Sequence, residues 1–122
     1  MAYALAVALQ VRPGCRQRVL EVIDQLRAVA ESSGECIAHV AHTPVAEPDT
    51  VWLYECYSSE EYHRDEHLVI PRVQELLADL TSLITLPWTV WQGHTWPPRE
   101  EHPHTARSAD AETFSTTDRS PA

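Results

Sequence analysis

Residues 3–11 read Tyr-Ala-Leu-Ala-Val-Ala-Leu-Gln-Val, a strict alternation in which large apolar side chains take one side and three alanines and Gln10 take the other. A period of two is that of a β-strand, in which successive side chains point to opposite faces of the sheet. The side that carries Ala4, Ala6 and Ala8 suits a surface that helices, a ligand or a second subunit approach closely, whereas a solvated face would carry charge. We therefore expect a strand buried on both faces.

A helix and a hairpin are predicted next. Residues 12–14, Arg-Pro-Gly, break the strand, and apolar residues then recur at helical spacing over 19–29 until Ser-Ser-Gly at 32–34 supplies a stop. Residues 36–42 return to a strand, and a short, turn-rich connection joins them to residues 51–57, which are dense in β-branched and aromatic side chains. Two strands joined so briefly should pair as a hairpin.

A second helix and a last strand complete the pattern. Ser58 and Ser59 offer a hydroxyl cap for a helix that is expected to bend and restart at Pro71. Residues 85–91 return to strand alternation, and Pro87 cannot donate a ladder hydrogen bond, so this strand should lie at a sheet edge or carry a bulge. The order βαββαβ predicts an α+β fold, an antiparallel sheet with the first and third strands central and both helices on one face.

Length and composition predict one domain followed by a tail. The chain has 122 residues, enough for one core. Residues 1–96 should form the domain, while residues 97–122 are rich in Pro, Ser, Thr and charged residues and contain one large apolar side chain, Phe114. Such a segment cannot bury enough surface to offset its ordering entropy, so we expect a flexible tail or an arm that docks Phe114 on a partner subunit.

Charge and cysteine usage exclude several classes of partner. The formal net charge is −9, from 18 acidic and 9 basic residues, which argues against nucleic-acid binding. No apolar run approaches the roughly 20 residues that span a bilayer, so no membrane partner is expected. Cys15, Cys36 and Cys56 are odd in number and form no CxxC pair, which favours a reducing cytoplasm over a disulfide framework.

Histidines provide two clusters with metal-ligand spacing, and we expect neither to hold a metal. His63 and His67 are four residues apart on one helical face, but a site needs a third convergent ligand and the HxxxH pattern alone has low specificity. In the other cluster, strand alternation puts Cys36 and His42 on one face and His39 on the opposite face, so the three cannot share an ion.

The aromatic residues have two interpretations that can coexist. They gather late in the domain and comprise Trp52, Tyr54, Tyr57, Tyr62, Trp88, Trp91 and Trp96. One interpretation is core packing and a dimer interface; the other is a flat pocket for a polycyclic ligand. A glycine-rich phosphate loop and a GxSxG elbow are both missing from the sequence, so chemistry would rely on acid/base groups. His67 or His63 can remove a phenolic proton near neutral pH.

Several stretches are similar to those of one protein family: Val-Arg-Pro-Gly at 11–14, Gly34, Pro-Asp at 48–49, the strand at 51–57, and above all His-Leu-Val-Ile-Pro-Arg-Val at 67–73. The last resembles the His-x-x-Ser-Pro-His-Phe stretch of the antibiotic biosynthesis monooxygenases, and the resemblance covers residues 3–96. His67 matches the first histidine of that stretch. Ile70 and Arg72 stand where the family has Ser and the second His.

The resemblance implies a ferredoxin-like fold that pairs into a homodimeric α+β barrel. The family includes oxygenases of aromatic polyketides that use no metal or tightly held prosthetic group, quinol oxidases, isomerase-like members and haem-degrading enzymes. The last use a characteristic asparagine, and this chain has no asparagine. We therefore predict a cytoplasmic oxygenase for antibiotic biosynthesis that oxidises a polycyclic aromatic polyketide, by anthrone or hydroquinone oxidation or by angucycline-type ring cleavage.

On this prediction O2 is the co-substrate, no metal or cofactor is tightly bound, and reduced flavin from a partner reductase stays open as a variant. His67 would be the base or orienter, with His63 as the other candidate, and Arg72 would steady the developing oxyanion. The substrate would be lined by Tyr54, Tyr57, Trp88, Trp52 and His39. Two alternatives are a non-oxidative isomerase or cyclase on the same fold and a ligand-binding or structural protein.

Overall fold

The computed structural model describes residues 1–97, and the predicted tail with Phe114 lies, from residue 98 onward, outside the described residues. The elements in order are β1 (Tyr3–Val11), α1 (Arg16–Ser32), β2 (Cys36–His42), β3 (Thr50–Tyr57), α2 (Glu60–Tyr62), the π-helical turn η1 (His63–His67), α3 (Pro71–Leu83) and β4 (Ile84–His94). None of the helices in this part of the chain is long and apolar enough to cross a membrane.

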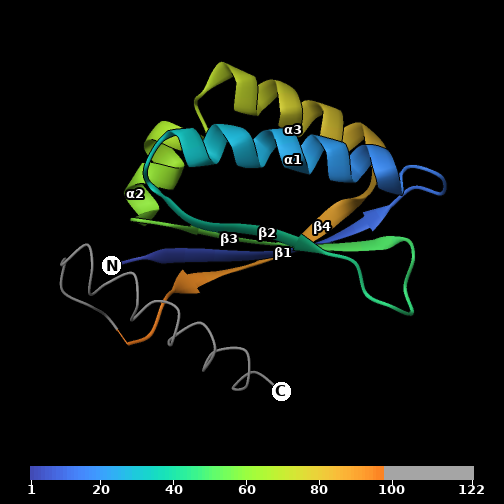
Figure 1. Cartoon of the computed structure of the whole chain (residues 1–122), viewed down its shortest axis with the longest axis horizontal. Helices are drawn as coiled ribbons and strands as arrows, with labels where there is room; N and C mark the ends of the chain where they lie inside the picture. The colour runs from blue at the N-terminus through green and yellow to red at the C-terminus, as the bar shows by residue number, and fades with distance from the viewer. Residues whose placement is uncertain (98–122) are drawn as a thin grey trace.

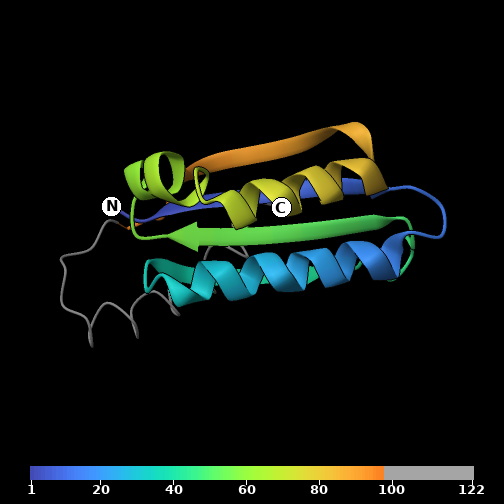
Figure 2. The same cartoon turned by 90° about the horizontal axis from the view of Figure 1, so that it is seen from above.

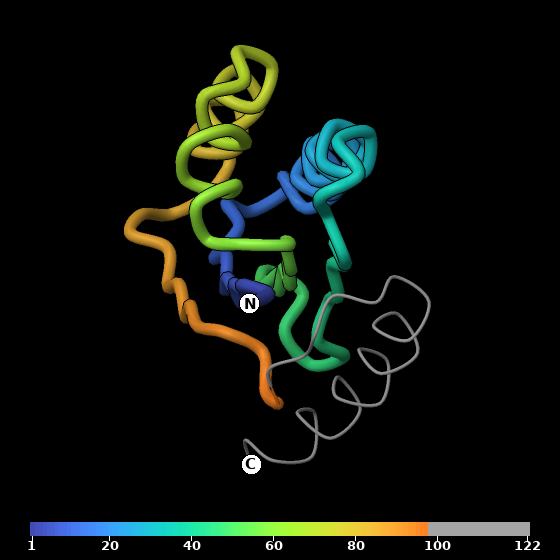
Figure 3. The backbone as a smooth tube through the Cα atoms, turned by 90° about the vertical axis from the view of Figure 1, so that its left-hand side faces the viewer, coloured from blue at the N-terminus to red at the C-terminus, as the bar shows by residue number. Residues whose placement is uncertain are grey.

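The four strands form one antiparallel sheet in the order β2-β3-β1-β4, so β1 and β3 are central. The long helices α1 and α3 lie side by side on one face of the sheet, and none of the helices within residues 1–97 lies on the other face (Figures 1 and 2). The view along the strands shows the two layers separately (Figure 3). The predicted βαββαβ order and the ferredoxin-like α+β fold are confirmed.

The last strand shows both features that Pro87 predicts. β4 is an edge strand that pairs only with β1 among the described strands. Its register shifts where Ala8 faces Thr89 and Gln10 faces Thr85, so several β4 residues oppose a single β1 position. This irregularity accommodates the residue that has no backbone N–H to donate.

The core lies between the sheet and the helices. The β1 side chains that face α1 and α3, from Tyr3 through Val11 at every second position, are all buried. Val7, Leu9 and Val11 pack in one cluster with buried side chains of both helices, including Val19, Val22, Ile23, Leu26, Val73, Leu76 and Leu80. Each such side chain contributes on the order of 1.5–3 kcal/mol on burial, so these contacts hold the helices over the sheet.

Packing on the opposite side of β1 explains why Ala6 and Ala8 are small. Trp52 of β3 and Trp91 of β4 flank β1, and their rings stack at a centroid separation of 5.3 Å. Two strands that flank a third lie about 10 Å apart, so the indoles of Trp52 and Trp91 meet above Ala6 and Ala8 of the strand between them. A larger side chain at either position would occupy the space of the indoles. Trp91 remains 52% exposed. Within residues 1–97 this side of β1 is only partly buried, so the described part of the chain does not by itself supply the expected burial of both faces.

Local sequence signals set the helix ends as predicted. Gly34 follows α1 with a positive φ of 77°, a conformation that glycine adopts without strain. The Ser59 hydroxyl accepts a hydrogen bond from the Tyr62 backbone N–H at 3.0 Å and caps α2. Ile70 is extended and Pro71 starts α3, so the helical segment breaks between η1 and α3.

Candidate functional site

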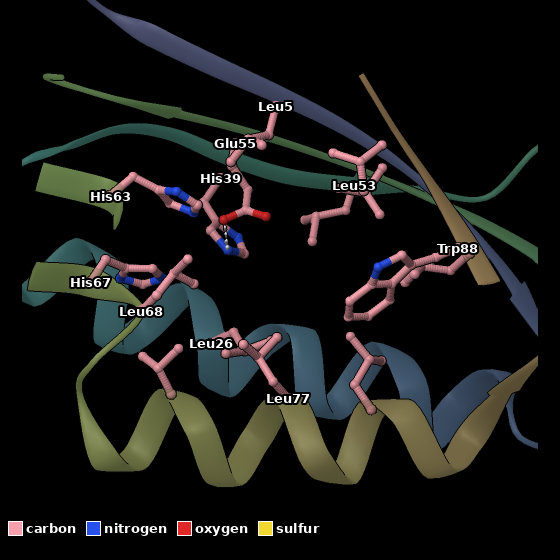
Figure 4. A pocket seen from close by; sticks show the side chains of 15 residues that line it. Leu5, Leu26, His39, Leu53, Glu55, His63, His67, Leu68, Leu77 and Trp88 are labelled. Carbon is pink, nitrogen blue, oxygen red and sulfur yellow. Dashed lines mark ion pairs between the residues drawn. The ribbon is translucent and has the colours of Figure 1, made fainter. Parts of the chain in front are cut away.

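A cavity of about 250 Å³ lies between the helix-facing side of the sheet and the helices. Apolar residues from five elements form its body, including Val7 of β1, Leu26 of α1, Leu53 of β3, Leu77 of α3 and Val90 of β4. Trp88 lies at one end, and a cluster of titratable side chains closes the other end (Figure 4). We call that cluster, which consists of His39, Glu55, His63 and His67, the polar cluster.

The π-helical turn brings two histidines of the polar cluster to the cavity. The Leu68 N–H donates to the His63 carbonyl oxygen at 3.1 Å, an i→i+5 bond that widens the turn. Within it, the His63 and His67 rings stack with centroids 5.5 Å apart and an interplanar angle of 23°. His67 is 3% exposed and His63 is half-buried, so the deeper imidazole lies behind a more accessible one.

The sheet supplies the other two members. Glu55 on β3 is paired with Leu5 on one side and with His39 of β2 on the other, so both polar side chains point toward the helices. The His39 Nε2 lies 3.7 Å from the Glu55 Oε1. The side chains are 2% and 13% exposed, respectively. A carboxylate is thus fixed at the polar end of an otherwise apolar cavity.

Tyr57 supports the polar cluster from the end of β3. Its hydroxyl donates to Glu55 Oε1 at 2.6 Å and lies 3.3 Å from His67 Nε2. Burial, reinforced by the adjacent carboxylate, raises the pKa of Tyr57 well above its ordinary value. The phenol therefore stays protonated and acts as a hydrogen-bond donor that orients Glu55.

Burial also decides the charge state of the histidines. Desolvation, followed by repulsion from His67, lowers the pKa of both His39 and His63 to about 4. Desolvation lowers the pKa of His67 as well, and it raises that of Glu55. At neutral pH the three imidazoles are therefore neutral, and each has a nitrogen lone pair that can accept a proton or bind a cation.

The structure brings only part of the predicted site together. His39, His63, His67 and Trp88 line the cavity, and Tyr57 contacts the polar cluster. Arg72 lies on the outer surface of α3, where its guanidinium, 51% exposed, binds Glu75 and Gln25. It is too far out to steady an anion in the cavity. The reason is helical geometry, since Val73 rather than Arg72 takes the inward position.

Two predicted lining residues lie on the wrong face of the sheet. Trp52 and Tyr54 alternate with Leu53 and Glu55, which point to the helices, so they belong to the helix-free face. They do not line the cavity. The Trp52 ring stacks instead between His42 and Trp91.

The predicted separation of Cys36 and His39 is also wrong. The register between β2 and β3 shifts between Cys36 and Ala38, so Ile37 is an extra residue in the strand. This bulge returns Cys36 to the face of its partner Tyr57, which is also the face of His39. His42 points to the opposite face, as Trp52, its partner, does.

Glu55 is the functional candidate that the sequence analysis missed. Its signal is present in the strand at 51–57, because Glu55 shares its face with Val51, Leu53 and Tyr57, the apolar positions of the alternation. A charged residue at a core-facing position is costly unless it is paired or functional. The residue also changes the argument about metals, since donor atoms of Glu55, His63 and His67 all lie within 4.8 Å of one another.

Comparisons with solved structures show the same fold. A Chloroflexus aurantiacus protein described as a candidate antibiotic biosynthesis monooxygenase is 24% identical, with a TM-score of 0.69 over 84% of this chain and 97% of that one. A Mycobacterium tuberculosis protein is 22% identical, with a TM-score of 0.67 over 83% and 98% of the two chains. A Nitrosomonas europaea protein, also described as a candidate member, is 12% identical with a TM-score of 0.73 over 81% and 94%.

The sequence comparisons give the family. No curated protein matches the chain significantly. The family model described as antibiotic biosynthesis monooxygenase matches residues 2–78, well over half of the chain and all of the polar cluster. This chain belongs to the antibiotic biosynthesis monooxygenase family.

Proposed function

We propose that the chain is an oxygenase that oxidises a hydroxylated polycyclic aromatic of polyketide type with O2, without a tightly bound prosthetic group. The observation that carries the proposal is the apolar cavity closed at one end by neutral imidazoles and a carboxylate. A flat ligand would place its rings along the leucines and Trp88 and its phenolic hydroxyl at the polar cluster.

The reaction we propose needs only a base and a dry cavity. An anthrone loses one proton from its ring CH₂ group to the base, and the resulting carbanion gives electrons to O2. The hydroperoxide that forms at this carbon loses water to leave a carbonyl group, so one oxygen atom enters the product and the other leaves as water. The substrate is the reductant, and exclusion of bulk water protects the carbanion from reprotonation.

His67 and His63 are the candidate bases in this scheme. Both line the cavity, and their lowered pKa values keep them unprotonated at neutral pH. His39 is a neutral imidazole with one N–H, which can donate to the carbonyl oxygen that shares the charge of the carbanion and so take the role that the sequence analysis gave to Arg72. Glu55 and Tyr57 act as positioning residues through their hydrogen bond.

We further propose that the chain works as a homodimer that covers the helix-free face. This face exposes Val40 and Trp91, which are 51% and 52% exposed, next to the small side chains of β1. An apolar aromatic surface of this kind is typical of protein interfaces. A second copy would bury it without blocking the cavity, which lies on the other side of the sheet.

The test is oxidation of a hydroxylated anthrone by purified protein under labelled O2, with chelator present and with or without reduced flavin. The catalysed rate is the oxidation rate with protein minus the autoxidation rate without protein. We expect one labelled oxygen atom in each product molecule. His67→Gln should lower turnover by about 100-fold or more if this imidazole is the base. Arg72→Ala is the matched control and should keep the wild-type rate.

Three results separate the alternatives. Equal conversion under nitrogen would refute the oxygenase and favour an isomerase or cyclase on the same fold. Binding of the aromatic compound without conversion in any condition would favour a ligand-binding protein. Turnover that requires reduced flavin would keep the oxygenase but replace direct reaction with O2 by a flavin-dependent one.

A further inference from the structure

The polar cluster has the donor set of a transition-metal site. Glu55 from β3 and two histidines from η1 present a carboxylate oxygen and two imidazole nitrogens that all lie within 4.8 Å of one another. We propose that Glu55, His63 and His67 bind one divalent transition-metal ion, of the class of Zn²⁺ or Co²⁺, at the polar end of the cavity.

The geometry requires only small side-chain movements. Donors bound tetrahedrally at about 2.0–2.2 Å from a zinc ion lie roughly 3.4 Å apart. The three donor atoms must therefore approach one another by at most about 1.4 Å, which χ rotations of side chains at a cavity wall can supply. His63 and His67 are already stacked with their ring centroids 5.5 Å apart, at the i,i+4 spacing that allows both rings to chelate one ion.

Among residues 1–97, no arginine forms an ion pair with Glu55. The Glu55 side chain is only 13% exposed, and its ion-pair partner within residues 1–97 is the imidazole of His39, whose Nε2 lies 3.7 Å from Oε1. Buried charges in proteins are generally paired or bound to a metal. In addition, the Nδ1 atoms of His39 and His67 are buried without a hydrogen-bond partner in the described part of the chain. A bound cation would balance the negative charge of the Glu55 carboxylate. It would also be coordinated by the nitrogen lone pairs of the ligating imidazoles.

The second layer of contacts also fits a metal site. Metal-bound carboxylates are usually hydrogen-bonded in turn, and Tyr57 already donates to Glu55 Oε1 at 2.6 Å. Three protein ligands leave a coordination position that faces the cavity, where water or a ligand oxygen can bind. Two imidazoles and one carboxylate select Zn²⁺, Co²⁺ or Fe²⁺ over Mg²⁺, which prefers oxygen donors.

This inference goes beyond the proposed function. A metal ion and a proton compete for the same imidazole lone pairs, so the ion-bound cluster and the free base are alternative states. Metal binding is therefore measured without substrate, whereas oxidation is measured after chelation. Failure of either experiment leaves the other proposal intact.

The experiment is titration of the full-length, chelator-stripped chain with Co²⁺ and Zn²⁺, followed by visible absorption and calorimetry, with Mg²⁺ as a comparison ion. We expect one Co²⁺ per chain, d–d bands of an N/O site without thiolate charge-transfer bands, and weak or no Mg²⁺ binding. Glu55→Gln and His63→Gln should each weaken Co²⁺ binding by at least about tenfold. Circular dichroism checks that both variants keep the wild-type fold.

Two controls locate the site. His42→Gln changes a histidine on the opposite face of the sheet and should leave the affinity unchanged. The double change His102→Gln and His104→Gln removes the histidines of the C-terminal segment and should also leave it unchanged. The proposal is overturned if the wild type binds no Co²⁺ or Zn²⁺, if Glu55→Gln and His63→Gln bind as tightly as wild type, or if the His102/His104 change abolishes binding.

Discussion

The buried position of His39 predicts an acid-sensitive fold. Burial, with repulsion from His67 and Arg27, lowers the pKa of this imidazole from 6.5 to about 4. The unfolded chain takes up the proton near pH 6.5 while the folded chain stays neutral, so stability is complete above that pH and is lost as the pH falls toward 4. One pKa unit corresponds to about 1.4 kcal/mol, so His39 alone should lower the unfolding free energy by about 3 kcal/mol at pH 4.

His63 also has its pKa lowered to about 4, so its protonation destabilises the fold in the same pH window. The pKa of His67 is lowered as well, so its protonation acts in the same direction. Glu55 works in the opposite sense, because its raised pKa lets the folded chain bind a proton before the unfolded chain does. The net proton uptake on unfolding is therefore smaller than the three histidines alone would give. Since domains of this size are stable by about 5–15 kcal/mol, the loss should be readily measurable.

The assay is urea unfolding followed by circular dichroism at several pH values between 7.5 and 4. His39→Gln removes one titrating group, so its unfolding free energy should fall with decreasing pH by up to about 1.4 kcal/mol per pH unit less than that of the wild type. His42→Gln is the matched control on the same strand. Parallel curves for wild type and His39→Gln, or a wild-type unfolding free energy that does not change between pH 6.5 and 4, would refute the reasoning.

Three further changes test other parts of the structure. Arg72→Ala should change the unfolding free energy by no more than about 0.5 kcal/mol, because its contacts are exposed, and a larger loss in urea unfolding would contradict the surface placement. Leu77→Trp should fill the cavity from α3 and weaken binding of an aromatic ligand by at least about tenfold in a fluorescence titration; an unchanged Kd would mean that the ligand binds elsewhere. Ala6→Arg should dissociate the proposed homodimer in sedimentation velocity because it puts a charge between the indoles of the helix-free face, whereas Gln17→Arg on the exposed side of α1 should not; a monomeric wild type would refute the dimer.

Local sequence patterns were sufficient for the architecture. The alternation at 3–11 predicts the central strand and its core-facing side, because the period of two is a property of extended backbone itself. Pro87 predicts the edge position of β4 from a missing N–H, and Ser59 and Pro71 mark helix starts through their own backbone chemistry. Each of these signals acts within a few residues of its own position.

The candidate site needed information that such patterns do not contain. The bulge at Ile37 changes the face of Cys36, and it is set by how β2 pairs with β3 rather than by the residues of β2 alone. Arg72 and Tyr54 have suitable chemistry but point away from the cavity, whereas Glu55 points into it from the same strand as Tyr54. The distance between Glu55 and the two histidines depends on how η1 packs over the sheet.

The sequence alone thus determined the order of elements, the family and the histidines worth testing. Only the tertiary structure decided that His39, Glu55, His63 and His67 share one end of an apolar cavity while Arg72 and Trp52 do not. The physical reason is that secondary structure follows from local backbone and side-chain preferences, whereas a site is made by contacts between strands and helices that are distant in the chain.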